Sequence, residues 1–353
     1  MPGGIEPVDM ASRGPHPPLT SSASGAPQVT NPSSVLPDLD LAGVAAAYER
    51  RVRDMCPEHL GLALRLLERL PPTRWTLEWR LPWWLGQAFG LDPSVAREIV
   101  LSNVLGLGSI RLQDDLADGE VAPGEVDGAR VLAGAMYEAA LEPYRARFDR
   151  SSPFWRHLDR QMAAWLAATD RDGSPESRLA ARGAPLHIAA GAVCLLGDRM
   201  EAYPALEACL DHALEALVVY DHLADWEADL DAGRWNAFVA AVSPGAQDPA
   251  ARDRHRATTY VAMLTADAVA GCFGRIDEGL LRSAAIADTL SPPVPPLADH
   301  LRRFAGGLRE QGAAVQERYR ALGERAANLL LSAPVDAHHG QARDGHVYRE
   351  EIA

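Results

Sequence analysis

Two groups of aspartates in this chain have the spacing of metal-binding carboxylates. The first group is Asp114, Asp115 and Asp118, in which Asp114 and Asp118 stand four positions apart. On a helix this spacing places both carboxylates on one face, about 6 Å apart along the axis. Carboxylates stacked near the C-terminal end of a helix repel one another and meet the negative end of the helix dipole. A divalent cation that prefers oxygen ligands, such as magnesium, removes this penalty.

The second group is Asp221, Asp225 and Asp229, at positions i, i+4 and i+8. These carboxylates would drift by only about 80° around a helix. Apolar residues precede them, which places the group where a buried helix emerges into solvent. Either group alone fits a solvated acidic helix face about as well as a metal site. Two such groups, each ending an apolar helix, favour the metal site.

Helices must position these carboxylates, and the apolar pattern predicts helices along most of the chain. Apolar residues recur at spacings of three and four from Leu39 onward, and Gly, Pro and Asp clusters separate the periodic stretches. Strand-like alternation is scarce, so the predicted fold class is all-α. The long stretches expected to be helical are 93–118, 128–148, 153–170, 176–196, 204–231, 235–242, 252–290 and 297–331.

Composition narrows the function classes. The formal net charge is −14, which excludes a general nucleic-acid or anionic-membrane surface. The chain has no lysine, so a bound diphosphate must be held by Arg, His, backbone amides or metal. No uncharged apolar stretch reaches the length of about 18 residues that suggests a transmembrane helix. A signal-peptide pattern is also absent, so a cytoplasmic protein without stable membrane insertion is expected.

The chain divides into three parts by composition. Residues 1–37 are rich in Pro, Gly and Ser and are expected to form a disordered N-terminal extension. Residues 38–332 carry the helical pattern and are expected to form one α domain. Residues 333–353 are polar and are expected to be a flexible C-terminal tail.

The two aspartate groups resemble motifs of the class I isoprenoid synthases, a superfamily that includes terpene cyclases, trans-prenyltransferases and squalene and phytoene synthases. Asp114-Asp115-x-x-Asp118 resembles the D-D-x-x-D motif, and Asp221, Asp225 and Asp229 resemble the second metal motif. The resemblance covers roughly residues 40–330. It implies an antiparallel helical bundle with a central active-site cavity. In such a bundle both motifs hold a magnesium cluster, for which manganese can substitute, and the cluster binds the diphosphate of a prenyl substrate.

The resemblance also implies roles for residues around the motifs. Arg182 lies where Gly183 and Pro185 interrupt a helix, and it is the expected diphosphate sensor, with a surface arginine beside a structural kink as the alternative. Leu107 and Val104 stand two and three turns before the first motif and are expected to form the wall that sets chain length. The other residues expected to bind substrate are Arg178, Arg234, Tyr220, Trp226, Arg318 and Tyr319.

The second motif resembles that of the cyclases in its i, i+4, i+8 spacing, and this resemblance implies a terpene synthase that ionises a linear prenyl diphosphate with magnesium and cyclises the carbocation. The Gly-Gly-Lys-Arg element of chain-elongating prenyltransferases is absent. An all-aspartate second motif is commoner in prenyltransferases and in squalene and phytoene synthases, so an enzyme that couples prenyl diphosphates is the alternative. A noncatalytic helical binding protein and a two-metal carboxylate hydrolase are more distant alternatives. The resemblance leaves open whether the chain forms a homodimer.

Overall fold

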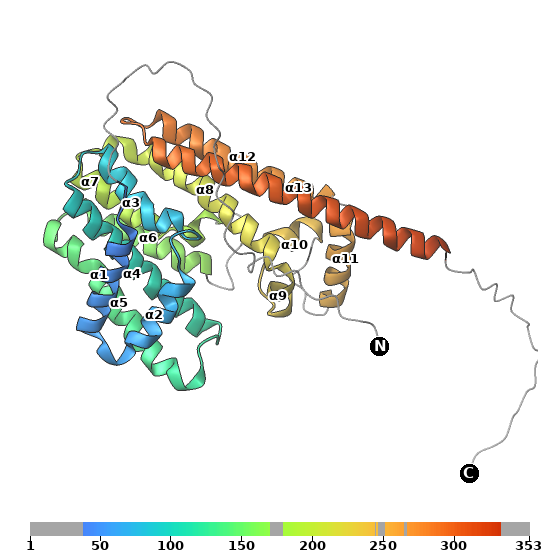
Figure 1. The fold of residues 1–353 in the computed structure, drawn as a ribbon, viewed down its shortest axis with the longest axis horizontal. Helices are drawn as coiled ribbons and strands as arrows, with labels where there is room; N and C mark the ends of the chain where they lie inside the picture. Colours follow the sequence, from blue (N-terminus) through green and yellow to red (C-terminus); the bar gives the residue numbers. More distant parts are fainter. Residues whose placement is uncertain (1–37, 170–178, 244, 246–250, 265–266, 333–353) are drawn as a thin grey trace, which may run out of the picture.

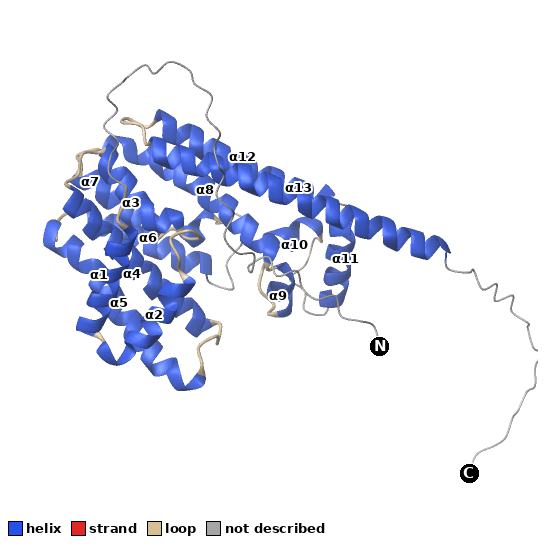
Figure 2. Cartoon of the chain, viewed as in Figure 1, coloured by secondary structure: helices blue, strands red, loops and turns tan. Residues whose placement is uncertain are grey.

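The computed structural model describes residues 38–169, 179–243, 245, 251–264 and 267–332. Every regular element in these ranges is a helix, as Figure 2 shows, which confirms the predicted all-α fold class. The predicted extension 1–37 and tail 333–353 lie outside the described residues. None of the described helices is both long enough and apolar enough to cross a bilayer. The α-helices are α1 (Leu41–Met55), α2 (Leu60–Arg69), α3 (Thr76–Ala88), α4 (Pro93–Ala117), α5 (Val126–Arg147), α6 (Pro153–Thr169), α7 (Leu186–Leu196), α8 (Tyr203–Ala224), α9 (Trp226–Asp231), α10 (Ala237–Val242), α11 (Arg252–Leu264), α12 (Asp267–Thr289) and α13 (Pro295–Ser332).

The helices fall into two groups that Figure 1 separates clearly. In one group, α1 to α7 gather around α4, which packs along α3 and α5. In the other, α8, α12 and α13 run side by side, with α12 packed against both neighbours. Helices α9, α10 and α11 lie near the end of α8 that carries the second motif. Since α7 contacts both α4 and α8, it connects the two groups.

Helix α4 carries the first motif, and buried hydroxyl groups fix its position. The Asp92 side chain caps its first turn by accepting a hydrogen bond from the Ser94 N–H. Further along, the Ser102 hydroxyl donates to the Ala140 carbonyl at 2.6 Å, and the Ser109 hydroxyl donates to the Ala133 carbonyl at 2.8 Å. Both bonds are buried and both reach α5. These two hydrogen bonds fix how far α4 extends along α5. They therefore fix the position of the first motif at the end of α4.

Glycines end the helices that carry the two motifs. Gly119 and Gly233 have φ values of +72° and +68°, a left-handed conformation that glycine adopts without steric penalty. After Gly119, the Glu120 N–H donates to the Asp115 carbonyl at 2.8 Å. After Gly233, the Arg234 N–H donates to the Asp229 carbonyl at 2.8 Å. These hydrogen bonds follow the pattern of a Schellman motif, so the chain reverses directly after each aspartate group.

Most of the predicted helices are present, with one break that the pattern did not predict. The stretch 204–231 is divided between α8 and α9, because Asp225 takes the non-helical backbone angles φ −104° and ψ 12°. The stretch 176–196 begins with the short 3₁₀ helix η4 (Ala180–Gly183) before α7, where the sequence predicted a break. The stretch 252–290 contains α11 and α12, and residues 265–266 between them lie outside the described ranges. Apolar periodicity continues through the break at Asp225, so the pattern alone does not reveal it.

Candidate active site

In the first motif, one carboxylate is already held by arginines. Asp115 is only 3% exposed. Arg69, at the end of α2, donates two hydrogen bonds to it, with Nη1–Oδ2 at 2.6 Å and Nη2–Oδ1 at 3.1 Å. Arg111 Nη2 lies 3.5 Å from Asp115 Oδ1. Two-pronged pairing of this kind is strong and directional, so Asp115 anchors α2 to α4 and is less available to a metal than its place in the motif implied.

Asp114 is the less constrained carboxylate of the first motif. Its side chain keeps about a third of its surface accessible, and its nearest cation is Arg111, at 3.7 Å. Burial raises the pKa of Asp114 to about 6, while Arg111 acts in the opposite direction. A carboxylate that is accessible yet poorly solvated by water is a favourable ligand for an incoming cation.

The second motif contains two carboxylates in a similar state. Asp221 and Asp225 make no side-chain hydrogen bond to any described residue. Burial raises the pKa of Asp221, and repulsion from Asp225 and Asp229 adds to the shift. Burial also raises the pKa of Asp225, with repulsion from Asp229 as the next cause. These unpaired negative charges repel one another, which a bound cation would relieve.

Arg234 joins the two motifs. Its Nη1 lies 2.9 Å from Asp118 Oδ2, and its Nε lies 3.0 Å from Asp229 Oδ1. Asn236 donates to the other oxygen of Asp229 at 2.8 Å and to the His222 carbonyl at 2.8 Å. The third aspartates of the two groups therefore share one guanidinium, although they are more than a hundred residues apart in the sequence.

Arg182, on η4, lies beside the second motif. Its Nη1 is 3.0 Å from Nε2 of His222, whose Nδ1 accepts a hydrogen bond from the Ala237 N–H at 3.1 Å. Burial lowers the pKa of His222 to about 4, and Arg182 contributes to the shift, so the ring is neutral near pH 7. A guanidinium has five N–H donors, and the contact with His222 engages one of them. Further donors of Arg182 therefore stay available for an anion.

Two arginines, Arg182 and Arg74, interact electrostatically with the carboxylates of the second motif. Burial lowers the pKa of Arg182, whereas Asp229 and Asp221 act to raise it, which places this guanidinium near the second motif. Arg74, in the turn before α3, lowers the pKa values of Asp221 and Asp225. Cations from the α2–α3 side of the molecule and from η4 therefore face the same carboxylates.

The exposure of these groups indicates a concave surface. Asp221 and Arg182 are exposed, and Asp114 is half-buried. Surrounding protein atoms nevertheless shift the pKa of each toward its neutral form. Accessible surface combined with poor solvation is typical of groups that line a cleft rather than a convex face.

Sequence reasoning missed Arg69, Arg74 and Asn236. The available signal for the two arginines was the absence of lysine, which leaves arginine as the main cationic residue type that could hold a diphosphate. Arg69 and Arg74 precede the first motif on adjoining elements. Nothing in the sequence pattern distinguished Asn236 from an ordinary helix cap. It does cap α10 by accepting hydrogen bonds from Phe238 and Val239.

Magnesium fits the donor chemistry of this cluster. Asp114, Asp221 and Asp225 offer carboxylate oxygens without strong hydrogen-bond partners, and hard cations prefer such oxygens. In the described ranges, no three His, Cys, Asp or Glu side chains are close enough together to form a metal-binding group. Metal binding by both motifs therefore stays a prediction.

The predicted chain-length residues differ in exposure. Leu107 is half-buried on α4, whereas Val104 has no exposed surface and packs in the core. The aromatic residues beside the second motif contact other helices. Tyr220 shares a hydrogen bond of 3.1 Å with the Gln311 amide on α13, and buried Trp226 packs edge-to-face on Tyr260 at 4.9 Å.

The remaining predicted binding residues lie on α13 or outside the described residues. Arg318 is exposed on α13. Its neighbour Tyr319 is half-buried, and burial raises its pKa, with Glu227 acting in the same direction. Glu227 also accepts a hydrogen bond from Tyr260 at 2.8 Å, so Tyr319 lies on the α9–α11 side of the second motif. Arg178 lies outside the described residues.

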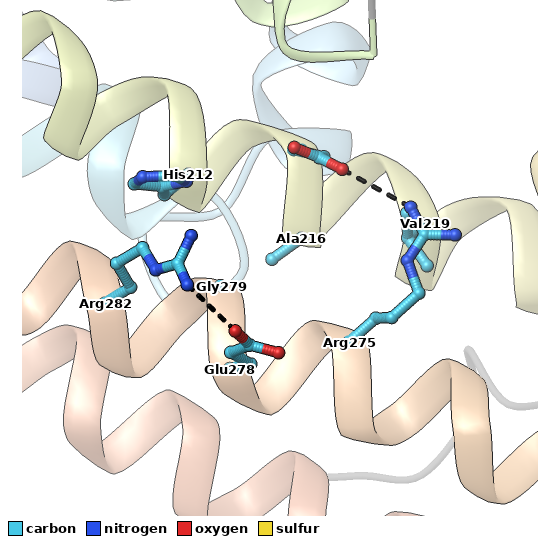
Figure 3. Close-up of a pocket in the computed structure, with 8 residues that line it drawn as sticks. His212, Ala216, Val219, Arg275, Glu278, Gly279 and Arg282 are labelled. Carbon is cyan, nitrogen blue, oxygen red and sulfur yellow. Dashed lines mark hydrogen bonds and ion pairs between the residues drawn. The ribbon is translucent and has the colours of Figure 1, made fainter. Parts of the chain in front are cut away.

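Two surface hollows lie away from the motifs. Figure 3 shows one of about 190 Å³ between α8 and α12, on the face of α8 opposite Asp221. Its charged side chains already pair with one another, Arg275 with Glu215 at 3.3 Å and Arg282 with Glu278 at 2.9 Å. The other hollow, of about 380 Å³, is lined by Arg145, Phe148, Arg150 and Trp155.

The arrangement of helices is similar to that of a solved structure, geranylgeranyl pyrophosphate synthetase from the archaeon Geoglobus acetivorans. The TM-score is 0.51 and the sequence identity is 15%, over 76% of this chain and 98% of that chain. No family model and no curated protein sequence matches this chain. At such low identity the similarity concerns the fold alone. The chain therefore has the all-helical isoprenoid synthase fold that its two aspartate motifs predicted.

Proposed function

We propose that this protein is an enzyme that ionises an allylic prenyl diphosphate and transfers its prenyl group to a second prenyl diphosphate, the acceptor. One observation carries the proposal: accessible carboxylates of two distant motifs and arginines from several elements meet at one place. An alternating set of anions and cations of this kind suits a ligand that combines diphosphate with a divalent metal. The similarity to a synthetase of prenyl diphosphates supports the same substrate class.

The proposed roles follow from the contacts. Arg182 has donors free for an anion and would hold the diphosphate oxygens. Asp114, Asp221 and Asp225 would hold magnesium, which supplies charge neutralisation to a departing diphosphate. Arg69 and Asn236 position Asp115 and Asp229, respectively. Apolar residues on α4, such as Leu107, would keep water away from a carbocation.

Arginines on two sides of the carboxylates favour prenyl transfer. Arg74 approaches from the α2–α3 turn, and Arg182 approaches from η4. Two separate cations can hold two diphosphates, one on the donor and one on the acceptor. In the reaction, the carbon–oxygen bond of the donor breaks and its electron pair leaves with the diphosphate. The electron pair of the acceptor's double bond then forms the new carbon–carbon bond, and the released diphosphate accepts a proton from the resulting cation, which restores a double bond.

Cyclisation of a single prenyl diphosphate is the second candidate. The absence of lysine, and with it of a Gly-Gly-Lys-Arg element, favours this reaction over chain elongation. The i, i+4, i+8 spacing of the second motif is also the spacing found in the cyclases that the chain resembles. Both candidates begin with the same loss of diphosphate.

Diphosphate release tests the proposal. The full chain would be incubated with geranyl, farnesyl and geranylgeranyl diphosphate, each alone and with isopentenyl diphosphate, in magnesium, in manganese and in excess chelator. We expect metal-dependent release and a product with the summed carbon number when both substrates are present. A hydrocarbon or alcohol of unchanged carbon number would instead identify the cyclase. No release from any substrate would refute the proposed function, and full turnover in chelator would refute the metal.

A further inference from the structure

Glu78 is a half-buried carboxylate to which none of the roles above applies. It lies on α3 between Leu77 and Trp79, which are 4% and 1% exposed. The described donor that reaches its carboxylate is its own backbone N–H. Its backbone carbonyl accepts a hydrogen bond of 2.6 Å from the Asn103 amide on α4. Placing an unpaired carboxylate in the interior costs free energy, so a sequence selected for stability alone would avoid it.

The contact with Asn103 places Glu78 below the first motif. Asn103 precedes Asp114 by eleven positions on α4, which corresponds to about three turns, the same helix face and about 16 Å along the axis. The residues between them on this face, Leu107 and Ile110, are also half-buried, while the flanking positions 104, 105, 108 and 109 are buried. A continuous accessible stripe therefore runs along α4 from the carboxylate cluster to the level of Glu78.

The stripe faces the inside of the molecule. At its upper end Arg111, next to Ile110, lowers the pKa of Asp221 on α8, so this face of α4 is directed toward α8. At its lower end Glu78 keeps accessible surface, yet burial raises its pKa to about 7. One turn before Glu78, the indole N–H of Trp75 is buried without a hydrogen-bond partner in the described structure. These properties fit groups that line an internal space rather than the outer surface.

We propose that the Glu78 carboxylate lines the inner end of the substrate cavity and accepts the proton that a carbocation loses there. The inference rests on the proposed ionisation of a prenyl diphosphate. With the diphosphate at the aspartates, the carbons beside Glu78 are those at the far end of the chain. A C–H bond next to the cationic carbon breaks, its electron pair forms a carbon–carbon double bond, and the proton binds a Glu78 oxygen. Water removes this proton as the product leaves. Charge reaches the far end only when a single prenyl diphosphate cyclises, so the role of Glu78 rests on the second candidate reaction, and a wild type that yields only coupled product would overturn it.

The test compares Glu78→Gln and Glu78→Ala with the wild type and with a surface control, Asp127→Asn, whose side chain is 98% exposed. Diphosphate release and product composition are measured in parallel, by phosphate detection and by gas chromatography with mass spectrometry. We expect release within about threefold of the wild type. We also expect the main alkene to fall at least fivefold, with alcohols and alkenes of shifted double-bond position in its place. The control should leave both readouts unchanged.

A folding measurement supports the interpretation of these variants. Burial raises the pKa of Glu78 in the folded protein from 4.5 to about 7, so the stability cost of the charged carboxylate grows as the pH rises between these values and is complete above about pH 7. Glu78→Gln should therefore melt above the wild type at pH 8, and the difference should shrink at pH 5. An unchanged product distribution in both variants, with an active wild type, would overturn the role of Glu78 alone. An inactive wild type would overturn the proposed function instead.

Discussion

The two acidic helix ends share a residue type and a four-residue spacing, yet they compensate their negative charge differently. In the first, Asp115 is buried and paired with Arg69, which comes from a neighbouring helix. In the second, Asp221 and Asp225 are exposed, and their carboxylates lack hydrogen-bond partners in the described structure. The first end therefore combines an anchor with the more accessible Asp114, whereas the second keeps two carboxylates available.

This difference shows that a motif position does not fix a physical role. A carboxylate that accepts two hydrogen bonds from arginine in a buried place contributes to folding, and removal of either partner leaves a charge unpaired. A carboxylate at a concave surface without a partner contributes little to folding and is free to bind a cation. Arg234 relates the two ends by pairing with Asp118 and Asp229 together.

The largest expected effect is on turnover in the second motif. Asp225→Asn should lower diphosphate release by roughly a hundredfold to a thousandfold, because it removes an available metal ligand. Its free energy of unfolding should change by no more than about 0.5 kcal/mol, since the side chain is exposed. Steady-state kinetics and urea denaturation measure the two quantities. Full activity in this variant would contradict the role given to the second motif.

The next effect concerns stability in the first motif. Asp115→Asn should lower the free energy of unfolding by about 2–3 kcal/mol, because Arg69 loses a buried carboxylate partner. Arg69→Gln should be destabilising as well, since it leaves Asp115 without its two-pronged partner. If Asp115→Asn unfolds at the same urea concentration as the wild type, the proposed contrast between anchor and ligand is wrong.

Loss of the bridge between the motifs should have a smaller effect. Arg234→Gln frees Asp118 and Asp229 and removes one cation from the site. The apparent KM for the prenyl diphosphate should rise about tenfold, which corresponds to roughly 1.4 kcal/mol of binding free energy. Arg234→Lys keeps the charge and should lie between Arg234→Gln and the wild type. Equal KM values in all three proteins would show that Arg234 does not act on the substrate.

The smallest expected effect is at Tyr220, beside the second motif. Tyr220→Phe removes the hydrogen bond to Gln311 and should cost about 0.5–1.5 kcal/mol of stability. Turnover should stay within about twofold, because the hydroxyl is directed toward α13. A tenfold loss of turnover with little loss of stability would show instead that Tyr220 reaches the substrate, as the sequence resemblance implied.

The helical class and most helix positions follow from the sequence because apolar periodicity is a local property. Stretches such as 93–118 and 153–170 end within a residue or two of α4 and α6. The break expected around Gly183 and Pro185 is also present, because these residues act on the backbone directly. The break at Asp225 has no such local signal and was missed.

The sequence by itself determined that two aspartate groups end helices, because spacing and apolar pattern are written along the chain. Only the tertiary structure decided which of these carboxylates are already paired. Arg69 lies 46 positions from Asp115, and Arg234 lies 116 positions from Asp118. Glu78 likewise depends on Asn103, from the next helix, for its position. Charge pairing and burial depend on distances through space, and helix packing, not the order of residues along the chain, sets those distances.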